Sequence, residues 1–276
     1  MENPEEIHII TFLEHSNDYS TISHQPLADR DEERRLRRSI PISTIDWQST
    51  TSSHFIPLSG LDFLSDVENV IIQQCVELSD VISNIPSENR YTVKVPRGET
   101  IYYASENSDL YQRNLFGSSR AFQMHLHDPT QQLALTLKKN LACGTCWTCC
   151  CLQVIEVYSA MGEYIGSTQQ KRHVTKPLFS VNDKFHNTVY KIKGPTKILC
   201  CSPEYFNFQI YASDGLTQIG SIVHQWDSVQ VSYNTILQFP NRRIDNKLKS
   251  LLLGAAFLIE YMYFENARKV SCKCFC

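Results

Sequence analysis

Apolar and polar residues alternate with a period of two through the central part of the chain, which is typical of strands with one buried face. Turn-forming residues such as Pro96-Arg97-Gly98 and Ser213-Asp214-Gly215 separate the runs. Many short strands at this spacing predict a mostly β domain, a barrel or a sandwich. The predicted strands cover residues 91–95, 100–104, 122–127, 134–137, 154–158, 179–181, 188–192, 206–211 and 218–223.

A different period precedes these strands. Apolar residues recur at steps of three and four at Leu61, Leu64, Val67, Ile71, Cys75, Leu78 and Ile82. This spacing predicts an amphipathic helix, or two short ones, packed on the β domain.

The last element is apolar on all sides. Residues 247–264 contain the run Leu251–Ile259, which predicts a helix buried all round. A membrane span is the alternative, but it needs ~20 mostly apolar residues, and Lys249 and Glu260 bracket a shorter stretch. We therefore favour a core helix over a membrane-inserting one. Its predicted site residues are Leu251, Leu252, Gly254, Phe257, Ile259 and Glu260.

Glu260 is the one acid within this apolar helix. A buried carboxylate needs a partner, and we expect a Lys, Arg or Tyr of the surrounding wall to supply it. A role in contacting lipid headgroups or in responding to protons is the alternative.

The N-terminal segment differs from the rest in composition. Residues 1–56 are rich in polar and charged residues and are predicted to be mostly disordered. We interpret the charged run Arg30–Arg38 as solvated, with a lipid-headgroup contact as the alternative. Residues 57–266 would form the folded domain, and residues 267–276 a tail of cysteines and basic residues.

Charge and leader sequence restrict the class of protein. The net charge of -3 over 276 residues is too near zero to imply a nucleic-acid binder. Met1–Glu6 is acidic, and Ile7–Leu13 is too short and too polar for a secretory signal. The 11 cysteines should therefore be reduced, which favours lipidation or metal ligation over disulfides.

Five cysteines in one loop are the sharpest chemical feature. Lipidation through thioesters needs accessible thiols beside basic residues, here Lys138 and Lys139, and it is the favoured interpretation. A zinc or iron–sulfur site is the second, although Cys200-Cys201 is the only further pair in the folded part. The third is a loop of reduced, unmodified cysteines. The five are Cys143, Cys146, Cys149, Cys150 and Cys151.

The C-terminus repeats this chemistry with Cys272, Cys274 and Cys276. It is not a C-a-a-X box, because Lys273 stands fourth from the end. We predict palmitoylation of Cys274 and Cys276 or no modification, with double prenylation of the closing Cys-Phe-Cys as a weaker alternative.

Motifs of hydrolases and phosphate-binding loops are missing from the sequence: it contains no G-x-S-x-G, no H-E-x-x-H and no glycine-rich phosphate loop. His125 and His127 alternate on one predicted strand, and we interpret them as ordinary strand residues. Neither hydrolytic nor redox chemistry is expected.

Four segments in order resemble the phospholipid scramblase family: Leu58–Leu64, Gly117–Phe122, Cys143–Val157 and Gly254–Glu265. The resemblance implies a tubby-like fold, a closed β-barrel around a hydrophobic C-terminal helix. It also implies movement of phospholipids between leaflets in both directions without ATP, usually activated by calcium.

The segment that would hold calcium in the family departs from the pattern here. Between Trp226 and Pro240 the sequence retains only Asp227, with Asp245 beyond it. Calcium takes 6–8 oxygen ligands, roughly, so two isolated acids separated by Arg242 and Arg243 would make a poor site. Calcium is therefore a doubtful cofactor here, and palmitate would be a covalent modification.

The resemblance and the residues together predict a membrane protein on the cytoplasmic face of the plasma membrane. It would mediate or regulate phospholipid movement, with phospholipids, protein partners or copies of itself as partners and no nucleic acid. A non-enzymatic, palmitoylated adaptor and a metal-binding regulatory protein are the alternatives. The basic residues expected to face lipid are Lys138, Lys139, Arg242 and Arg243.

Overall fold

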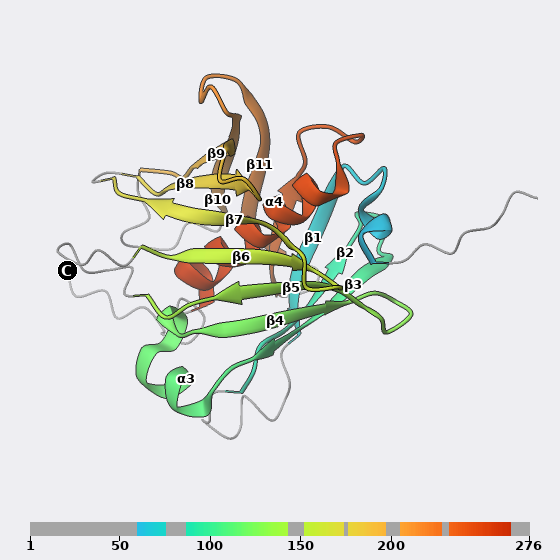
Figure 1. The fold of residues 1–276 in the computed structure, drawn as a ribbon, viewed down its shortest axis with the longest axis vertical. Coiled ribbons are helices and arrows are strands. Elements are labelled where there is room, and N and C mark those ends of the chain that lie inside the picture. Colours follow the sequence, from blue (N-terminus) through green and yellow to red (C-terminus); the bar gives the residue numbers. More distant parts are fainter. Residues whose placement is uncertain are drawn as a thin grey trace, which may run out of the picture. The chain divides into compact units, whose positions relative to one another are not determined.

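Twelve antiparallel strands form one closed barrel in the part of the chain that the computed structural model describes (Figure 1). The described residues are 60–75, 87–142, 152–173, 176–196, 205–227 and 232–265, with only the backbone at Tyr205, Asp227 and Ser232. The strands are β1 (Asn69–Cys75), β2 (Arg90–Lys94), β3 (Thr100–Asn107), β4 (Phe122–His127), β5 (Leu133–Lys139), β6 (Val154–Ser159), β7 (Tyr164–Lys171), β8 (Leu178–Asp183), β9 (Thr188–Lys193), β10 (Tyr205–Ala212), β11 (Gln218–Asp227) and β12 (Ser232–Gln238).

Neighbours in the barrel are neighbours in sequence, except where the barrel closes. At that point β1 pairs with β12, with Asn69 opposite Gln238 and Gln73 opposite Asn234. Closure leaves no unpaired sheet edge. The predicted strands are confirmed, and of the two predicted architectures the barrel is the one observed.

Because successive strands are antiparallel, their connections alternate between the two ends of the barrel. One end holds the β1–β2, β3–β4, β5–β6, β7–β8, β9–β10 and β11–β12 connections. The β3–β4 connection contains α3 (Leu110–Phe116) and η2 (Gly117–Ser119), so we name this the α3 end; it lies at the left in Figure 1. The opposite end carries η1 (Gly60–Leu64) and the short hairpin turns, and we name it the η1 end.

The predicted helix is wrong over the described residues 61–75. A 3₁₀-helix, η1, ends at Leu64, Asp66 has a positive φ of 56°, and the chain then enters β1. The β-branched residues of β1 favour a strand, and its backbone groups pair with both β2 and β12. Val70 and Ile72 face the core with a period of two, so the helical spacing was coincidental. Leu78 and Ile82 lie outside the described residues.

The predicted C-terminal helix is confirmed, and it fills the barrel (Figure 1). It consists of α4 (Asn246–Ile259) and a π-helical turn, η3 (Glu260–Phe264). Gly254 permits close contact with the wall, because a Cβ there would lie 2.8 Å from Cγ2 of Val157. The predicted helix residues are all buried: Leu251, Leu252, Gly254, Phe257, Ile259 and Glu260.

This arrangement confirms the predicted fold class, a closed barrel around a buried C-terminal helix. Of the two interpretations of the helix, the structure has the core one. Within the described residues, no helix reaches the length and apolarity needed to cross a bilayer. The predicted disordered segment 1–56 and tail 267–276 lie outside the described residues.

Candidate functional site

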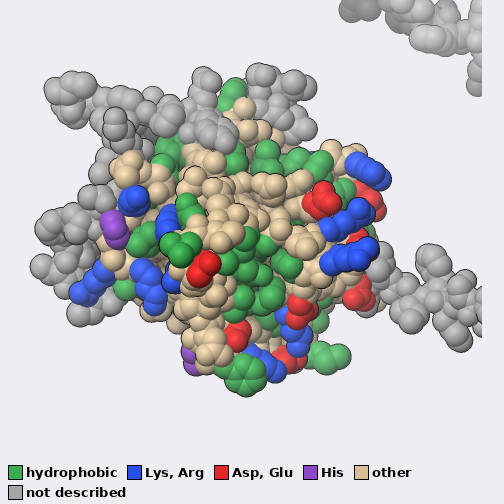
Figure 2. Space-filling view, turned by 90° about the horizontal axis from the view of Figure 1, so that it is seen from above, with side chains coloured by type: hydrophobic (Ala, Val, Ile, Leu, Met, Phe, Trp, Pro, Cys, Tyr) green, Lys and Arg blue, Asp and Glu red, His purple; other side chains and the backbone are tan. Residues whose placement is uncertain are grey.

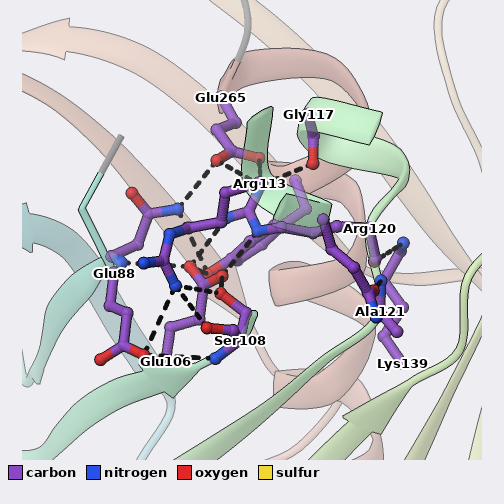
Figure 3. A network of polar contacts seen from close by, with 12 residues as sticks. Glu88, Glu106, Ser108, Arg113, Gly117, Arg120, Ala121, Lys139 and Glu265 are labelled. Atoms are coloured by element: carbon purple, nitrogen blue, oxygen red, sulfur yellow. Dashed lines mark hydrogen bonds and ion pairs between the residues drawn. The ribbon is translucent and has the colours of Figure 1, made fainter. Parts of the chain in front are cut away.

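A buried network of charged side chains occupies the α3 end of the barrel (Figure 3). At its centre is Arg120, which directly follows η2. Its Nε and Nη2 donate to the two carboxylate oxygens of Glu106 on β3, at 2.6 and 2.7 Å. Its Nη1 lies 2.8 Å from Oε1 of Glu265, the residue that follows η3. The bidentate geometry toward Glu106 is the arrangement that makes an arginine–carboxylate pair strong.

The charges in this network stabilise one another. Burial alone would raise the pKa of Glu106, but the hydrogen bond and charge of Arg120 hold that pKa below its ordinary value. Burial would likewise lower the pKa of Arg120, yet the two carboxylates raise it. Glu106 and Arg120 are therefore both ionised at neutral pH.

Uncharged partners complete the network. The hydroxyl of Tyr261, on η3, donates to Oε2 of Glu106 at 2.8 Å. Asn89 donates through its side chain to Oε1 of Glu265 at 2.9 Å and through its backbone to Glu106 at 3.1 Å. The network thus joins β3, two connections of the α3 end and the last turn of the C-terminal helix.

Lys139 belongs to this network, so its prediction as a lipid-facing residue is wrong. Its side chain is 1% exposed, and its Nζ donates to the carbonyl oxygens of Arg120 at 2.8 Å and Ser119 at 3.2 Å. Burial and the positive charge of Arg120 lower the pKa of Lys139 to about 8. The lysine side chain that reaches the surface is its neighbour Lys138, which is half-buried and lies over the ring of Tyr158.

Glu260 has partners of another kind than the expected Lys, Arg or Tyr. Its Oε2 accepts a hydrogen bond from Thr235 of β12 at 2.6 Å and lies 3.3 Å from Nδ1 of His224 on β11. The His224 ring is stacked between Phe264 and Tyr233, at centroid distances of 3.7 and 5.1 Å. The wall of the barrel therefore does hold this acid, through a histidine and a threonine.

A second polar contact fixes the other end of the helix. Lys249 of α4 is fully buried at the η1 end, and its Nζ donates to the carbonyl oxygens of Leu64, Val67 and Arg242 at 2.7–2.9 Å. Burial lowers the pKa of Lys249. The two ends of the C-terminal helix are thus attached to the barrel by Lys249 and Glu265.

The remaining predicted basic residues lie at the η1 end. Arg242 and Arg243 are exposed, and Nε of Arg242 donates to the carbonyl oxygen of Asp66 at 2.8 Å. They lie at the opposite end of the barrel from the charged network, so the four basic residues predicted to face lipid do not form one surface.

The predicted lipidation sites, Cys143, Cys146, Cys149, Cys150, Cys151, Cys274 and Cys276, lie outside the described residues. The described residues beside them can be placed. Ala142 donates its backbone N–H to Ser119, next to Arg120, and Glu265 pairs with Arg120 itself. The chain therefore leaves the described region toward both cysteine clusters from the α3 end.

A shallow pocket of about 310 Å³ lies beside the network at the α3 end. It is lined by backbone and side chains of β3, β4 and β5, including Asn107, Gln123 and Lys138. A second surface pocket, of about 410 Å³, lies on the outer wall between β1, β11 and β12 and contains no charged residue.

The described residues do not fit a calcium ion. The carboxylate of Asp245 caps α4 by accepting the backbone N–H of Lys247 at 3.0 Å. Asp227 ends β11, and its side chain is not described. No cluster of three or more His, Cys, Asp or Glu side chains suited to a metal occurs among the described residues. That this protein has no high-affinity calcium site remains a prediction.

Sequence reasoning assigned no role to Arg120, Glu106, Glu265 or Asn89. Arg120 and Glu265 lie in two of the segments that resemble the family, Gly117–Phe122 and Gly254–Glu265, and this resemblance is the one signal in the sequence that could have drawn attention to them. A strand glutamate and a helix-end glutamate look like surface residues until the fold brings them together.

Comparison with known proteins agrees with this architecture. The family model described as Scramblase matches residues 50–266. The chain is 33% identical over 212 residues to phospholipid scramblase 1 of Homo sapiens, covering 75% of this chain and 66% of that protein. It is 34% identical over 214 residues to phospholipid scramblase 2 of Homo sapiens, covering 76% and 71%.

A more distant relative is matched over more of its own length. Phospholipid scramblase family member 5 of Homo sapiens is 28% identical over 224 residues, covering 78% of this chain and 82% of that protein. The family match spans the whole described barrel and its helix. The chain belongs to the scramblase family.

Proposed function

We propose that this protein mediates or regulates the ATP-independent movement of phospholipids between leaflets, working from the cytoplasmic face of the plasma membrane. Its relatives are named phospholipid scramblases, and membrane phospholipids are the partners that membership of the family implies. One observation carries the proposal: the residues that precede the two cysteine-rich segments, Ala142 and Glu265, both lie at the α3 end.

The position of the cysteines favours one orientation on a membrane. Of the 11 cysteines of the sequence, Cys75 ends β1, seven fall in the β5–β6 and β9–β10 connections, and three follow η3. At each of these places, the described residues next to the cysteines lie at the α3 end. Acyl chains on Cys143–Cys151 and on Cys274 and Cys276 would therefore hold the barrel with its α3 end toward the bilayer.

The barrel interior is an unsuitable path for lipid headgroups. α4 fills it with buried apolar residues, and Lys249 and Glu265 attach the helix at both ends. Lipid movement would then take place where the outside of the barrel meets the bilayer, or between several copies of the chain.

The filled interior also favours a second candidate function. A barrel without an internal path is equally suited to an adaptor, which would hold a protein partner at the membrane and move no lipid itself. This alternative makes a clear prediction for the purified protein.

Purified protein in liposomes tests the choice. Fluorescent phospholipids in the outer leaflet are bleached by dithionite, and the fraction that remains protected reports movement between leaflets. Lipid movement above that of protein-free vesicles supports the proposal, and its absence in vesicles that contain folded protein supports the adaptor. The assay is run with calcium and with a chelator, and we expect little difference, because the described acids do not form a calcium site.

A further inference from the structure

Most of the exposed large apolar side chains lie at the two ends of the barrel, apart from Tyr103 on β3 and Trp226 on β11. At the α3 end they are close together in sequence, on α3 and just after β5. At the η1 end they stand singly at the tips of three hairpins: Met161, Phe185 and Leu216. The group at the α3 end consists of Leu110, Tyr111, Leu115, Phe116 and Leu141.

The orientation of α3 is the reverse of an ordinary surface helix. No residue of α3 is buried, and Tyr111 and Leu115 are 77% and 75% exposed. Its polar residues make the contacts with the protein: Arg113 donates to Oγ of Ser108 at 3.0 Å, and Oε1 of Gln112 accepts the backbone N–H of Ala121 at 3.1 Å.

A soluble helix normally turns its apolar side inward and its polar side outward. An exposed apolar patch marks a contact surface. In α3, the polar residues Arg113 and Gln112 bind other parts of the protein, and the apolar residues are left facing outward. The side chain of Asp109 caps the helix by accepting the backbone N–H of Tyr111 at 2.7 Å.

Basic residues follow on the same rim. Around the α3 end, the β3–β4 connection with α3 is succeeded by Leu141 after β5, and then by the β7–β8 connection. That connection begins with Lys171 and Arg172 and reaches Lys176, all exposed. In Figure 2, whose left edge corresponds to the α3 end, lysine and arginine side chains lie at both edges, but few acidic side chains accompany those at the left edge.

We infer that α3 and Leu141 form a lipid-contacting surface at the α3 end. Tyr111, Leu115 and Phe116 would enter the interfacial layer of a bilayer, while Lys171, Arg172 and Lys176 would contact anionic headgroups. Exposed apolar residues on one rim with basic ones have the chemistry of an interfacial membrane anchor. The inference rests on the proposed membrane function and adds an attachment that needs no acyl chain.

The two cysteine-rich stretches that continue from this end favour a membrane, rather than a protein, as the partner of the α3 surface. Residues 143–151 directly follow Ala142, next to Leu141, and residues 266–276 follow Glu265 at the same end. Both stretches contain the predicted acylation sites. An apolar helix beside two such stretches would face the bilayer that the acyl chains enter.

Flotation of the full chain with vesicles tests the inference. The protein is made in a bacterial host, so that it carries no palmitate, and is mixed with phosphatidylcholine vesicles with or without ~30% phosphatidylserine. The test variant is Tyr111→Ser/Leu115→Ser. The matched control is Met161→Ser/Leu216→Ser, which changes two side chains that are 97% and 83% exposed at the η1 end.

The α3 variant should partition into the serine-containing vesicles about 10-fold or more weakly than wild type, while the control variant keeps wild-type partition. Changing Lys171, Arg172 and Lys176 to Ala should remove most of the difference between the two kinds of vesicle. Thermal unfolding of each variant checks that the barrel remains folded.

Three outcomes would overturn the inference: no vesicle binding by wild type, loss of binding in the control instead of the α3 variant, or unchanged binding of the α3 variant. The last outcome would mean that another part of the chain or a protein partner covers α3. Because flotation does not depend on lipid movement, α3-dependent binding without scrambling would support this inference and reject the scrambling function. Lipid scrambling by a protein whose vesicle binding does not depend on α3 would reject this inference and support the scrambling function.

Discussion

Arg120 and Glu265 are 145 positions apart and form a buried ion pair, with 2.8 Å between Nη1 and Oε1. The pair attaches the end of the C-terminal helix to the connection that carries α3. Since Arg120 also binds Glu106 through two nitrogens, the attachment is part of a satisfied network rather than an isolated buried charge.

Removing Arg120 should destabilise the barrel strongly. Arg120→Met leaves two carboxylates buried without their cation, which costs about 3–5 kcal/mol in the free energy of unfolding. Arg120→Lys should recover only part of this, because lysine lacks the planar donor geometry that matches Glu106. Urea unfolding of both variants measures the effect. Arg243→Met, at an exposed position, is the control and should change stability by less than ~0.5 kcal/mol; equal losses at Arg120 and Arg243 would contradict the network.

Lys139 should make stability depend on pH in the alkaline range. Its pKa is about 8 in the folded protein and 10.5 ordinarily, so between these values the unfolded chain binds a proton that the folded protein does not. Stability from this group therefore rises as pH increases through that interval, by up to ~3 kcal/mol.

The comparison that isolates this effect is wild type against Lys139→Met, measured by urea unfolding from about pH 7 to about pH 10. The wild type should gain stability relative to the variant as pH rises. Lys138→Met, at the neighbouring surface position, should follow the wild-type curve. A constant difference between wild type and Lys139→Met would show that folding does not lower the pKa of Lys139.

Local patterns were sufficient for most of the strands and for the helix that fills the barrel. The period of two in Phe122–His127 and the all-round apolar run Leu251–Ile259 both survive in the structure, because each pattern reflects what the element buries. β1 was mistaken for a helix, since Leu61, Leu64 and Ile71 match a helical period by chance. β7 and β12 were missed, because neither has a long alternating apolar run.

The candidate site could not be predicted in the same way. Glu106, Arg120 and Glu265 are brought together by closure of the barrel around the helix, which no local period reports. Lys139 illustrates the same limit: beside Lys138 in a basic pair it resembles a surface residue, and only strand alternation and the position of Arg120 turn it inward.

Gly254 should be intolerant of larger side chains. Its added Cβ would contact Val157, a stiff β-branched residue of β6. Gly254→Leu should prevent stable packing, and Gly254→Ala should lower the free energy of unfolding by about 1 kcal/mol, because overpacking outweighs the gain in helix propensity. Differential scanning calorimetry measures both.

Space at Val157 should relieve this overpacking. Val157→Ala alone creates a cavity and destabilises the barrel, but the double variant Gly254→Ala/Val157→Ala should lose less than the sum of the two single changes. Strict additivity would mean that the two side chains do not compete for the same space.

His224 and Glu260 should be coupled energetically. His224→Phe keeps an aromatic ring between Phe264 and Tyr233 but removes a partner of the buried carboxylate, and it should cost about 1–3 kcal/mol. With Glu260→Gln added, the loss should be smaller than the sum of the single losses. A double-mutant cycle by urea unfolding measures the coupling, and a coupling of zero would contradict the contact. Retained folding with lost lipid movement in Glu260→Gln would instead indicate a functional role for the acid.

The five loop cysteines should determine acylation. In cells, wild type should be labelled by acyl exchange and found in the membrane fraction, and changing Cys143, Cys146, Cys149, Cys150 and Cys151 to Ser should abolish most of the labelling and shift protein toward the soluble fraction. Cys75→Ser, at the end of β1, is the control and should behave like wild type. Unlabelled protein that remains on membranes would assign the attachment to α3 or to the C-terminal tail.

The pairing of β1 with β12 also determines when the protein can fold. During synthesis, the strand at residues 69–75 must wait for residues 232–238 before the ring can close, and α4, which fills the ring, is made after that. Contacts between such distant residues form slowly, and until they form, the inner faces of the strands remain exposed to aggregation. We therefore expect folding to be a single late event that requires nearly the whole described chain, and chains interrupted before α4 to be substrates for chaperones rather than smaller stable domains.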